Sequence, residues 1–425
     1  MVPERTTAEK EALKVLEALE STRLDQLFTA SQTNYYGKAG FDALRVSVGV
    51  SKEAVWRLVE AIRHANGLLV LESAWGDFQV RVTPTAQLME VLYQIDTWSS
   101  RSLFGRTDMP ADEEWIVLDR LLVEEAVLVA VAKAGQRPSE QEVARTRSAV
   151  ICMLYDNEPP STEAELVAMR FYRAMRALPA NGQAITPEFI REIHRMLREG
   201  EPDAGELRAV ELLSADGSPS DSASPADRIP RELEAMCAYA QSEDVPFVHP
   251  LIKAIGLAWW IRHVKPFERH NHLVSRLISM AFATSYGYRV TGIIDPDRRI
   301  HLHQESGDDL TAWFIQQLGV IKRAKGLAEE RLQNRVARFD EATARLAALG
   351  LNHRQALIID HALRDPATTF TIRHHAATRD LAYETARRDF LKLVEVGYLE
   401  QRKRGKAFEF QLAPDAEKRI ARKTR

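Results

Sequence analysis

The sequence contains only two cysteines, Cys152 and Cys237, among 425 residues. Two cysteines cannot form a disulfide framework, and their scarcity is typical of a reducing compartment. The first ten residues are charged and lack the apolar stretch of a signal peptide. No apolar run approaches the roughly 18 residues that a membrane-spanning helix requires. We therefore expect a cytoplasmic protein that does not enter a membrane.

An excess of either charge is also missing, because 57 Lys and Arg stand against 60 Asp and Glu, for a formal net charge of -3. This balance excludes a uniformly basic coat for nucleic acids but is compatible with a local basic patch. Apolar residues make up 45% of the chain, which is enough to form buried cores. The length favours two to four domains.

Apolar residues at steps of three and four predict helices through most of the chain. Ser139, Thr162 and Thr186 occupy positions typical of N-caps. The predicted helices are Trp115–Ala134, Glu140–Tyr155, Glu163–Leu178, Pro187–Glu199, Pro230–Gln241, Pro250–Val264 and Leu273–Tyr286. Residues 326–350 are interpreted as a solvated connecting helix, with a short dimerising coiled coil as the alternative.

The C-terminal residues 351–412 predict three helices followed by a β-hairpin. This is the plan of a winged helix-turn-helix, and it resembles the wing-bearing regulators whose recognition helix carries Thr-Ala-x-Arg-Asp-Leu. The side chains expected in its core are those of Ala386, Phe390, Leu393 and Val394. The candidate DNA-binding residues are Tyr383, Glu384, Arg387 and Arg388 on the third helix, and Arg402, Lys403, Arg404 and Lys406 at the wing.

Charge supports a DNA contact by this segment. Residues 351–425 hold 16 Lys and Arg against 10 Asp and Glu, in a chain that is negative as a whole. The excess lies at the wing and in the tail Lys418–Arg425, where phosphate contacts are expected. A winged helix used for protein contacts is the alternative.

The N-terminal residues 10–84 follow the same plan. They predict a second helix at Phe41–Arg45, a third helix over Lys52–Asn66 capped by Ser51, and a wing-like hairpin over residues 68–83. Residues 1–93 carry 10 Lys and Arg against 12 Asp and Glu, which does not favour DNA binding. Lys52, Arg57, Arg63 and His64 form a candidate basic stripe on the third helix.

The central residues 249–280 predict a buried helix, a nine-residue polar loop and a second buried helix beginning near Leu273. The loop reads Lys265-Pro-Phe-Glu-Arg-His-Asn-His-Leu-Val-Ser-Arg276. It resembles the active loop of the Fic family, His-Pro-Phe-x-Asp/Glu-Gly-Asn-Gly-Arg-x-x-Arg. Residues 185–197, Gly205–Arg208 and 224–230 match further family features in the family's order. The resemblance covers residues 115–412, because a C-terminal winged helix is common in that family.

The resemblance implies a mainly α fold in which a Fic-like helical core is flanked by winged helix-turn-helix modules. The expected organisation is an N-terminal winged-helix-like module (1–93), a linker (94–114), a Fic-like domain (115–325), the connecting helix (326–350), the winged helix-turn-helix (351–413) and a basic tail (414–425). Most members of the family transfer AMP from ATP to a protein hydroxyl.

The residues that carry that chemistry in the family are largely replaced here. Lys265 stands at the position of the catalytic His, Arg269 at that of the metal-binding acid, His270 and His272 at those of two phosphate-cradling glycines, and Leu273 at that of the first Arg. Pro266, Phe267, Asn271 and Arg276 are retained. In the inhibitory motif Ser-x-x-Ile-Glu-Gly, Ser148 and Ile151 are kept, and Cys152 replaces the Glu. A protonated lysine is a poor general base. We therefore expect no catalytic residues and no cofactor.

Two ligand hypotheses remain for the loop. Lys265, Arg269, Asn271 and Arg276 are candidate anion-binding residues for a nucleotide or phosphate. His263, His270 and His272, with the pair His301 and His303, have spacings that a zinc or nickel site uses, but the cysteines do not complete such a site. We expect no metal.

The favoured function is a DNA-binding regulator, acting as a homodimer on double-stranded DNA, whose inactive Fic-like scaffold serves dimerisation or ligand sensing. The first alternative is a diverged Fic-type nucleotidyl- or phosphoryl-transferring enzyme that uses altered chemistry at Lys265. The second is a protein-interaction module, which would not need the basic C-terminal segment.

Overall fold

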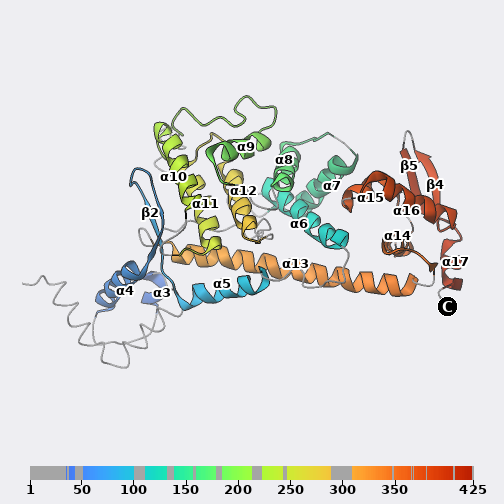
Figure 1. Cartoon of the computed structure of the whole chain (residues 1–425), viewed down its shortest axis with the longest axis horizontal. Coiled ribbons are helices and arrows are strands. Elements are labelled where there is room, and N and C mark those ends of the chain that lie inside the picture. The colour runs from blue at the N-terminus through green and yellow to red at the C-terminus, as the bar shows by residue number, and fades with distance from the viewer. Residues whose placement is uncertain are drawn as a thin grey trace, which may run out of the picture. The chain divides into compact units, whose positions relative to one another are not determined.

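The computed structural model of the chain is mainly α-helical, as expected (Figure 1). The structure describes residues 35, 38–43, 51–99, 111–131, 138–156, 159–178, 184–212, 223–242, 247–288, 309–346, 349–364, 366, 368–379, 381–404 and 407–423. The chain divides into two compact units, one of residues 1–103 and 173–324 and the other of residues 104–172 and 325–425. No helix in the described ranges is long and apolar enough to cross a membrane.

The first unit contains a small N-terminal module and a group of buried helices. The N-terminal module comprises α3 (Lys38–Asp42), α4 (Lys52–Asn66), β1 (Leu68–Glu72) and β2 (Gln79–Val82), followed by α5 (Ala86–Ser99). The buried group comprises α9 (Pro187–Leu197), the short 3-10 helix η1 (Ala226–Arg228), α10 (Ile229–Gln241), α11 (Pro250–Val264) and α12 (Asn271–Ser285). Strands β1 and β2 pair antiparallel, from Leu68 opposite Val82 to Glu72 opposite Gln79.

Helices α11 and α12 pack along each other and form the centre of the first unit, with α9 and α10 against them. Helix α11 is apolar around nearly its whole circumference, which is the pattern of a helix buried on all sides. Trp260, Val264, Leu273 and Leu277 are each at most 2% exposed. Burial of one such side chain contributes about 1.5–3 kcal/mol, so this pair is a rigid support for the loop that joins it.

The second unit contains α6 (Ala111–Val131), α7 (Glu140–Asp156) and a C-terminal module. This module comprises α14 (His353–Arg364), β3 (Phe370–Thr371), α15 (Ile372–Thr378), α16 (Tyr383–Glu395), β4 (Leu399–Arg404), β5 (Ala407–Leu412) and α17 (Ala416–Lys423). Its three strands form one antiparallel sheet in the order β3-β5-β4. Two helices, α8 (Glu163–Ala177) and α13 (Thr311–Leu346), contribute residues to both units.

Helix starts agree with the capping residues in the sequence. The side-chain oxygens of Ser51, Ser139, Thr162 and Thr186 each accept an N–H bond of 3.2 Å from the residue three positions later. Each bond satisfies one of the N–H groups that a helix start leaves without an internal partner. The predicted bounds of Lys52–Asn66 and Pro250–Val264 are confirmed.

Three local expectations were wrong. Helix α12 begins at Asn271 rather than near Leu273, because the N–H groups of Leu273 and Val274 already bond to the carbonyl of His270. Residues 402–406 were expected to form the turn of the hairpin, but strand β4 continues through Arg402 to Arg404, which pairs with Ala407. The basic tail contains a helix, α17, because two apolar residues one turn apart enter the core of the C-terminal module. Helix α5 extends to Ser99, into the segment 94–114 that was expected to be a linker. The domain boundaries stay predictions.

Candidate functional sites

The loop between α11 and α12 has an unusual backbone at both ends. Lys265 ends α11 with φ 50° and ψ 64°, and His270 precedes α12 with φ 60° and ψ 16°. Among the described residues other than glycine, these two alone have positive φ. The left-handed conformation is unfavourable by roughly 1–2 kcal/mol for a residue with a Cβ. His270 thus adopts, without being glycine, a backbone conformation that glycine favours.

Asn271 holds the loop closed through its own amide group. The N–H of Phe267 donates to its Oδ1 at 2.9 Å, and its Nδ2 donates to the carbonyl of Phe267 at 2.6 Å. Both the oxygen and one N–H of the side-chain amide therefore bind backbone, and the second N–H of Nδ2 stays a candidate donor for the predicted anion.

Phe267 anchors the middle of the loop in the core. Its ring is fully buried and stacks on the ring of His194 from α9, with centroids 3.8 Å apart and planes 8° from parallel. The Nδ1 of His194 accepts the N–H of Gly205 at 3.0 Å. Burial lowers the pKa of His194 to about 4, so its imidazole is neutral at pH 7. This residue lies in the segment that matched a family feature, but its role was not predicted.

Arg208 binds the C-terminal end of α11. Its Nε donates to the carbonyl of Lys265 at 2.8 Å, and its Nη2 donates to that of Val264 at 3.3 Å and to that of Ser224. Its backbone N–H donates to the carbonyl of Pro266 at 3.0 Å. Carbonyls at a helix C-terminus lack internal partners and carry partial negative charge, so a buried guanidinium is well matched to them. From the sequence, Arg208 was identified only as part of a family feature, and its bonds to the end of α11 were not predicted.

The side chain of Lys265 is partly buried beside two other cations. Burial lowers its pKa, and the guanidinium groups of Arg208 and Arg262 lower it further. Of the remaining candidates, Arg269 is exposed and Arg276 is partly buried. Lys265, Arg269 and Arg276 therefore stay candidates for the predicted anion site, together with Asn271.

The histidines near the loop do not form a metal site within the described residues. His263 stacks on Trp259, with centroids 4.7 Å apart, and meets the edge of Phe78 at 4.5 Å. The rings of His270 and His272 lie 6.3 Å apart. No group of three or more His, Cys, Asp or Glu side chains suited to a metal occurs in the described ranges. His301 and His303 lie outside them.

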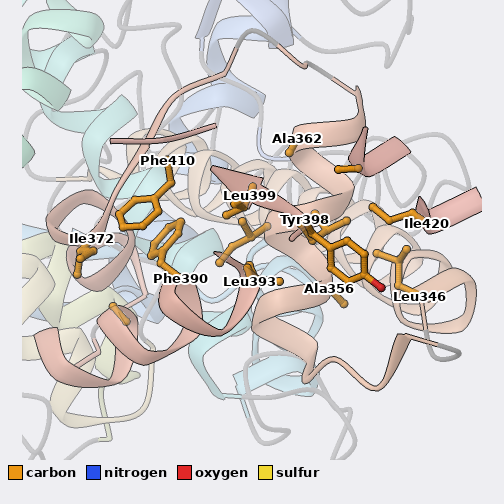
Figure 2. Packing of buried hydrophobic residues seen from close by; sticks show 14 of the residues in the cluster. Leu346, Ala356, Ala362, Ile372, Phe390, Leu393, Tyr398, Leu399, Phe410 and Ile420 are labelled. Atoms are coloured by element: carbon orange, nitrogen blue, oxygen red, sulfur yellow. The ribbon is translucent and has the colours of Figure 1, made fainter. Parts of the chain in front are cut away.

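The C-terminal module has a continuous apolar core (Figure 2). Ala386, Phe390 and Leu393 of α16 are fully buried, and Val394 packs against the same core. The rings of Phe390 and Phe410 stack with centroids 4.7 Å apart, which joins α16 to β5. The predicted inward face of this helix is therefore the buried one.

A buried carboxylate joins α16 to the start of α14. Asp389 is 3% exposed and accepts bonds from Arg354 Nε (2.7 Å), Asn352 Nδ2 (3.0 Å) and Gln355 Nε2 (3.2 Å). Burial alone would raise the pKa of Asp389, but the bonds from Arg354 and Asn352 and the charge of Arg354 hold it below its ordinary value. From the sequence, Asp389 was recognised only as the Asp of the Thr-Ala-x-Arg-Asp-Leu motif, and its buried role was not predicted.

The opposite face of α16 is open to solvent. The four candidate residues Tyr383, Glu384, Arg387 and Arg388 are all exposed, and the exposed fraction of Tyr383 is 56%. Arg387 Nη1 lies 2.9 Å from Glu384 Oε1, and Arg388 Nε donates to the carbonyl of Glu384 at 3.4 Å. One glutamate therefore holds both arginines near the start of the helix.

The wing candidates are described in part. Arg402 and Lys403 are exposed on β4, and Arg402 Nη2 pairs with Glu400 Oε1 at 2.5 Å. The side chain of Arg404 and the whole of Lys406 lie outside the described residues. Helix α17 buries Ala416 and Ile420 and exposes Lys418, Arg419 and Arg422. It follows the end of β5 that pairs with Leu399, at the base of the hairpin.

Comparisons with known proteins identify the central part of the chain. Residues 184–283, which hold α9, α10, α11, the loop and nearly all of α12, match the model of the Fic/DOC family. This part of the chain is therefore a Fic/DOC family domain. No curated protein matches the chain.

Three solved structures are similar to the chain. A Fic family protein from Desulfovibrio desulfuricans G20 is 16% identical, with a TM-score of 0.42 over 79% of this chain and 99% of that one. A Fic domain containing signaling protein from Bacteroides thetaiotaomicron VPI-5482 is 14% identical, with a TM-score of 0.43 over 58% and 97%. Fic-1 from C. elegans is 15% identical, with a TM-score of 0.42 over 80% and 90%.

Proposed function

We propose that this protein is a DNA-binding regulator in which the Fic/DOC domain is a catalytically inactive scaffold. The observation that carries the proposal is the two-sided character of α16. Its inner face is anchored by Phe390 and Asp389, and its outer face presents Tyr383, Arg387 and Arg388 to solvent. A helix fixed on one side and basic on the other is suited to the major groove of double-stranded DNA.

The elements around α16 support the same interpretation. The order α14, β3, α15, α16, β4, β5 is that of a winged helix-turn-helix, with β4 and β5 as the wing. Arg402 and Lys403 extend from β4 into solvent. We assign the wing to phosphate contacts, which position the protein, and α16 to base contacts, which select the sequence.

Catalytic inactivity is proposed from the loop. Lys265 takes the place of the family's general base, and the glycine positions are filled by His270 and His272. The amide of Asn271 is bonded to the backbone of Phe267, where it supports the loop. We propose that the scaffold serves dimerisation or senses an anion, such as a nucleotide or phosphate, through Lys265, Arg269, Asn271 and Arg276.

The test of DNA binding uses selected double-stranded DNA and a series of salt concentrations with the full chain. Replacing Arg387 and Arg388 by alanine is expected to weaken specific binding by roughly 1–3 kcal/mol for each guanine that an arginine no longer binds. Replacing Arg402 and Lys403 is expected to weaken binding to all DNA sequences alike. It should also reduce the slope of affinity against salt concentration by about 1 per phosphate contact. Arg57→Ala, which removes an exposed arginine of α4, is the control. Specific binding that survives all the C-terminal changes would contradict the assignment.

The state of assembly is tested in the same samples. We propose a homodimer, whose two winged helices would select an inverted repeat with a fixed half-site spacing. Sedimentation equilibrium of the free protein and the spacing of the selected sites measure the two parts of this statement. A monomer that binds single half-sites would refute it.

One observation favours a second function. Burial and two arginines lower the pKa of Lys265, which makes its amine more nucleophilic than that of an exposed lysine. A diverged nucleotidyl- or phosphoryl-transferring enzyme would use that amine. Labelled ATP with magnesium or manganese and cell lysate is expected to give no transfer. Steady labelling that Lys265→Ala abolishes would refute the inactive scaffold and support this enzyme instead.

A further inference from the structure

The β1–β2 hairpin of the N-terminal module packs on the helix that carries the loop. The ring of Phe78 meets the rings of Trp259, Trp260 and His263 of α11, with centroids 5.0, 5.9 and 4.5 Å apart. Trp259 and His263 lie one helical turn apart, and His263 is two residues before Lys265. Phe78 therefore covers the last turns of α11 before the loop.

A buried carboxylate fastens the turn of the hairpin to the same helices. Glu232 of α10 is 1% exposed and accepts bonds from Ser73 Oγ at 2.9 Å and from Trp260 Nε1 at 3.1 Å. Ser73 also accepts the backbone N–H groups of Trp75 and Asp77, which shape the turn. Because a buried carboxylate without partners is strongly unfavourable, these bonds make the position of the turn specific.

Close packing and surface charge complete the contact. A Cβ added to Gly256 of α11 would lie 3.3 Å from Cδ2 of Leu71, so the Leu71 side chain of β1 packs tightly on the helix at this glycine. At the surface, Asp77 Oδ2 pairs with Arg228 Nη1 at 2.6 Å. Arg228 and Arg231 lie over the ring of Trp75, at 5.3 and 4.7 Å from its centroid.

The basic stripe expected on α4 is engaged within its own module. Lys52 Nζ donates to the carbonyl of Asp42 at 2.7 Å, and Arg57 lies 3.6 Å from Glu53. Arg63 is buried, with its guanidinium 3.9 Å from the ring centroid of Tyr35. The helix that would read DNA in this module thus offers mixed charges and a buried arginine.

We propose that the β1–β2 hairpin is a brace that holds the last turns of α11, and through them Lys265 and residues 266–270, in place. The proposal goes beyond the proposed function and gives the N-terminal module a different task from the C-terminal one. The hairpin that could serve as a wing is occupied by an internal contact. DNA reading is then left to one winged helix in each chain.

The test is amide hydrogen exchange of the full chain, with Phe78→Leu and Phe78→Ala against Leu69→Ala. Leu69 is on the same hairpin but is 40% exposed, so its truncation removes mainly exposed apolar surface. Both Phe78 variants are expected to raise exchange in residues 261–270 by roughly tenfold or more, the alanine variant the most, while Leu69→Ala leaves it unchanged. Unchanged exchange in residues 261–270 overturns the brace, as does a rise of equal size throughout α9, α10, α11 and α12.

DNA binding by the same variants separates this proposal from the preceding one. The brace predicts that the Phe78 variants keep the affinity for selected DNA, because α16 is untouched. If no form of the protein binds DNA but the exchange result is obtained, the proposed function fails and the brace stands. A drop in affinity in Phe78→Leu equal to that of the Arg387 and Arg388 variant would show that the hairpin is itself a DNA contact, and would refute the brace.

Discussion

The loop after α11 and the surface of α16 use polar side chains in opposite ways. Around the loop, Asn271, Arg208 and His194 all bind backbone groups of the loop or of the segment beside it. On α16, Asp389 is turned inward, whereas Arg387 and Arg388 remain at the surface. A polar residue kept in a functional motif can therefore be a structural support, and only its partners distinguish the two roles.

The difference also concerns what a ligand would meet. At the loop, the amide of Asn271 is already bonded to the backbone of Phe267, so a ligand could bind this side chain without breaking those bonds only through the second N–H of Nδ2. On α16, the ion pair between Arg387 and Glu384 is exposed, and an exposed pair contributes only about 0–1 kcal/mol. DNA phosphates or bases could take the place of Glu384 as the partner of Arg387 at little cost in free energy. Substitutions of the supporting side chains should therefore lower the stability of the protein much more than substitutions at the surface positions.

The largest effect is expected for Asp389→Ala. The change leaves the buried side of Arg354 without its partner, and breaking a largely buried ion pair is unfavourable by roughly 3 kcal/mol. Glu384→Ala, on the exposed face of the same helix, should stay within about 0.5 kcal/mol. Hydrogen exchange of α16 in the full chain measures both. Equal protection in the two variants would remove the distinction between the inner and outer faces.

The pH dependence of stability should reveal His194. Its pKa is about 4 in the folded protein, below the ordinary 6.5, so the unfolded chain binds the proton first as pH falls. Stability is therefore full above pH 6.5 and is lost on acidification to about pH 4, by an amount on the order of 3 kcal/mol. Urea unfolding of the wild type and His194→Gln at pH 7.5 and 4.5 measures it. His375, with a pKa of about 3, acts in the same direction and is present in both proteins. Parallel pH profiles would show that His194 is not the cause.

Asn271→Ala removes two hydrogen bonds from the loop and should lower the free energy of unfolding by about 2 kcal/mol. Glu268→Ala, at an exposed position of the same loop, is the control and should have little effect. Urea unfolding of the full chain compares the two. A larger effect at Glu268 than at Asn271 would contradict the supporting role assigned to the amide.

The smallest effect is expected when two glycines are compared. Gly205 and Gly287 both have positive φ, of 81° and 89°. A Cβ on Gly205 would lie 3.1 Å from the carbonyl oxygen of Arg191, whereas one on Gly287 would meet nothing within 4 Å. Both alanine variants carry the strain of a left-handed residue, roughly 1 kcal/mol. Gly205→Ala should therefore be the less stable in urea, and the difference measures how tightly the segment packs beside the loop.

Periodicity and capping residues were enough to locate most helices. Thr186 and Ser51 begin their helices as expected, and the inward face of α16 follows from its apolar spacing. These features depend on interactions within three or four residues, which a sequence displays directly. The family resemblance of the centre was equally readable, because its landmarks occur in a fixed order, and residues 184–283 do match the Fic/DOC family.

The partners of the polar side chains that bond across long stretches of sequence were decided only by the tertiary structure. Arg208 lies 57 positions from Lys265, whose carbonyl it binds, and Ser73 lies 159 positions from Glu232. No local pattern brings such pairs together, since they meet only after the helices and the hairpin have packed. The same holds for α17, which forms on the core of the C-terminal module although its sequence is largely charged. Apolar spacing and capping residues thus predicted the elements, and the resemblance of the motifs indicated the family of the central domain. Burial and long-range packing determined which polar residues of the motifs support the fold and which remain at the surface.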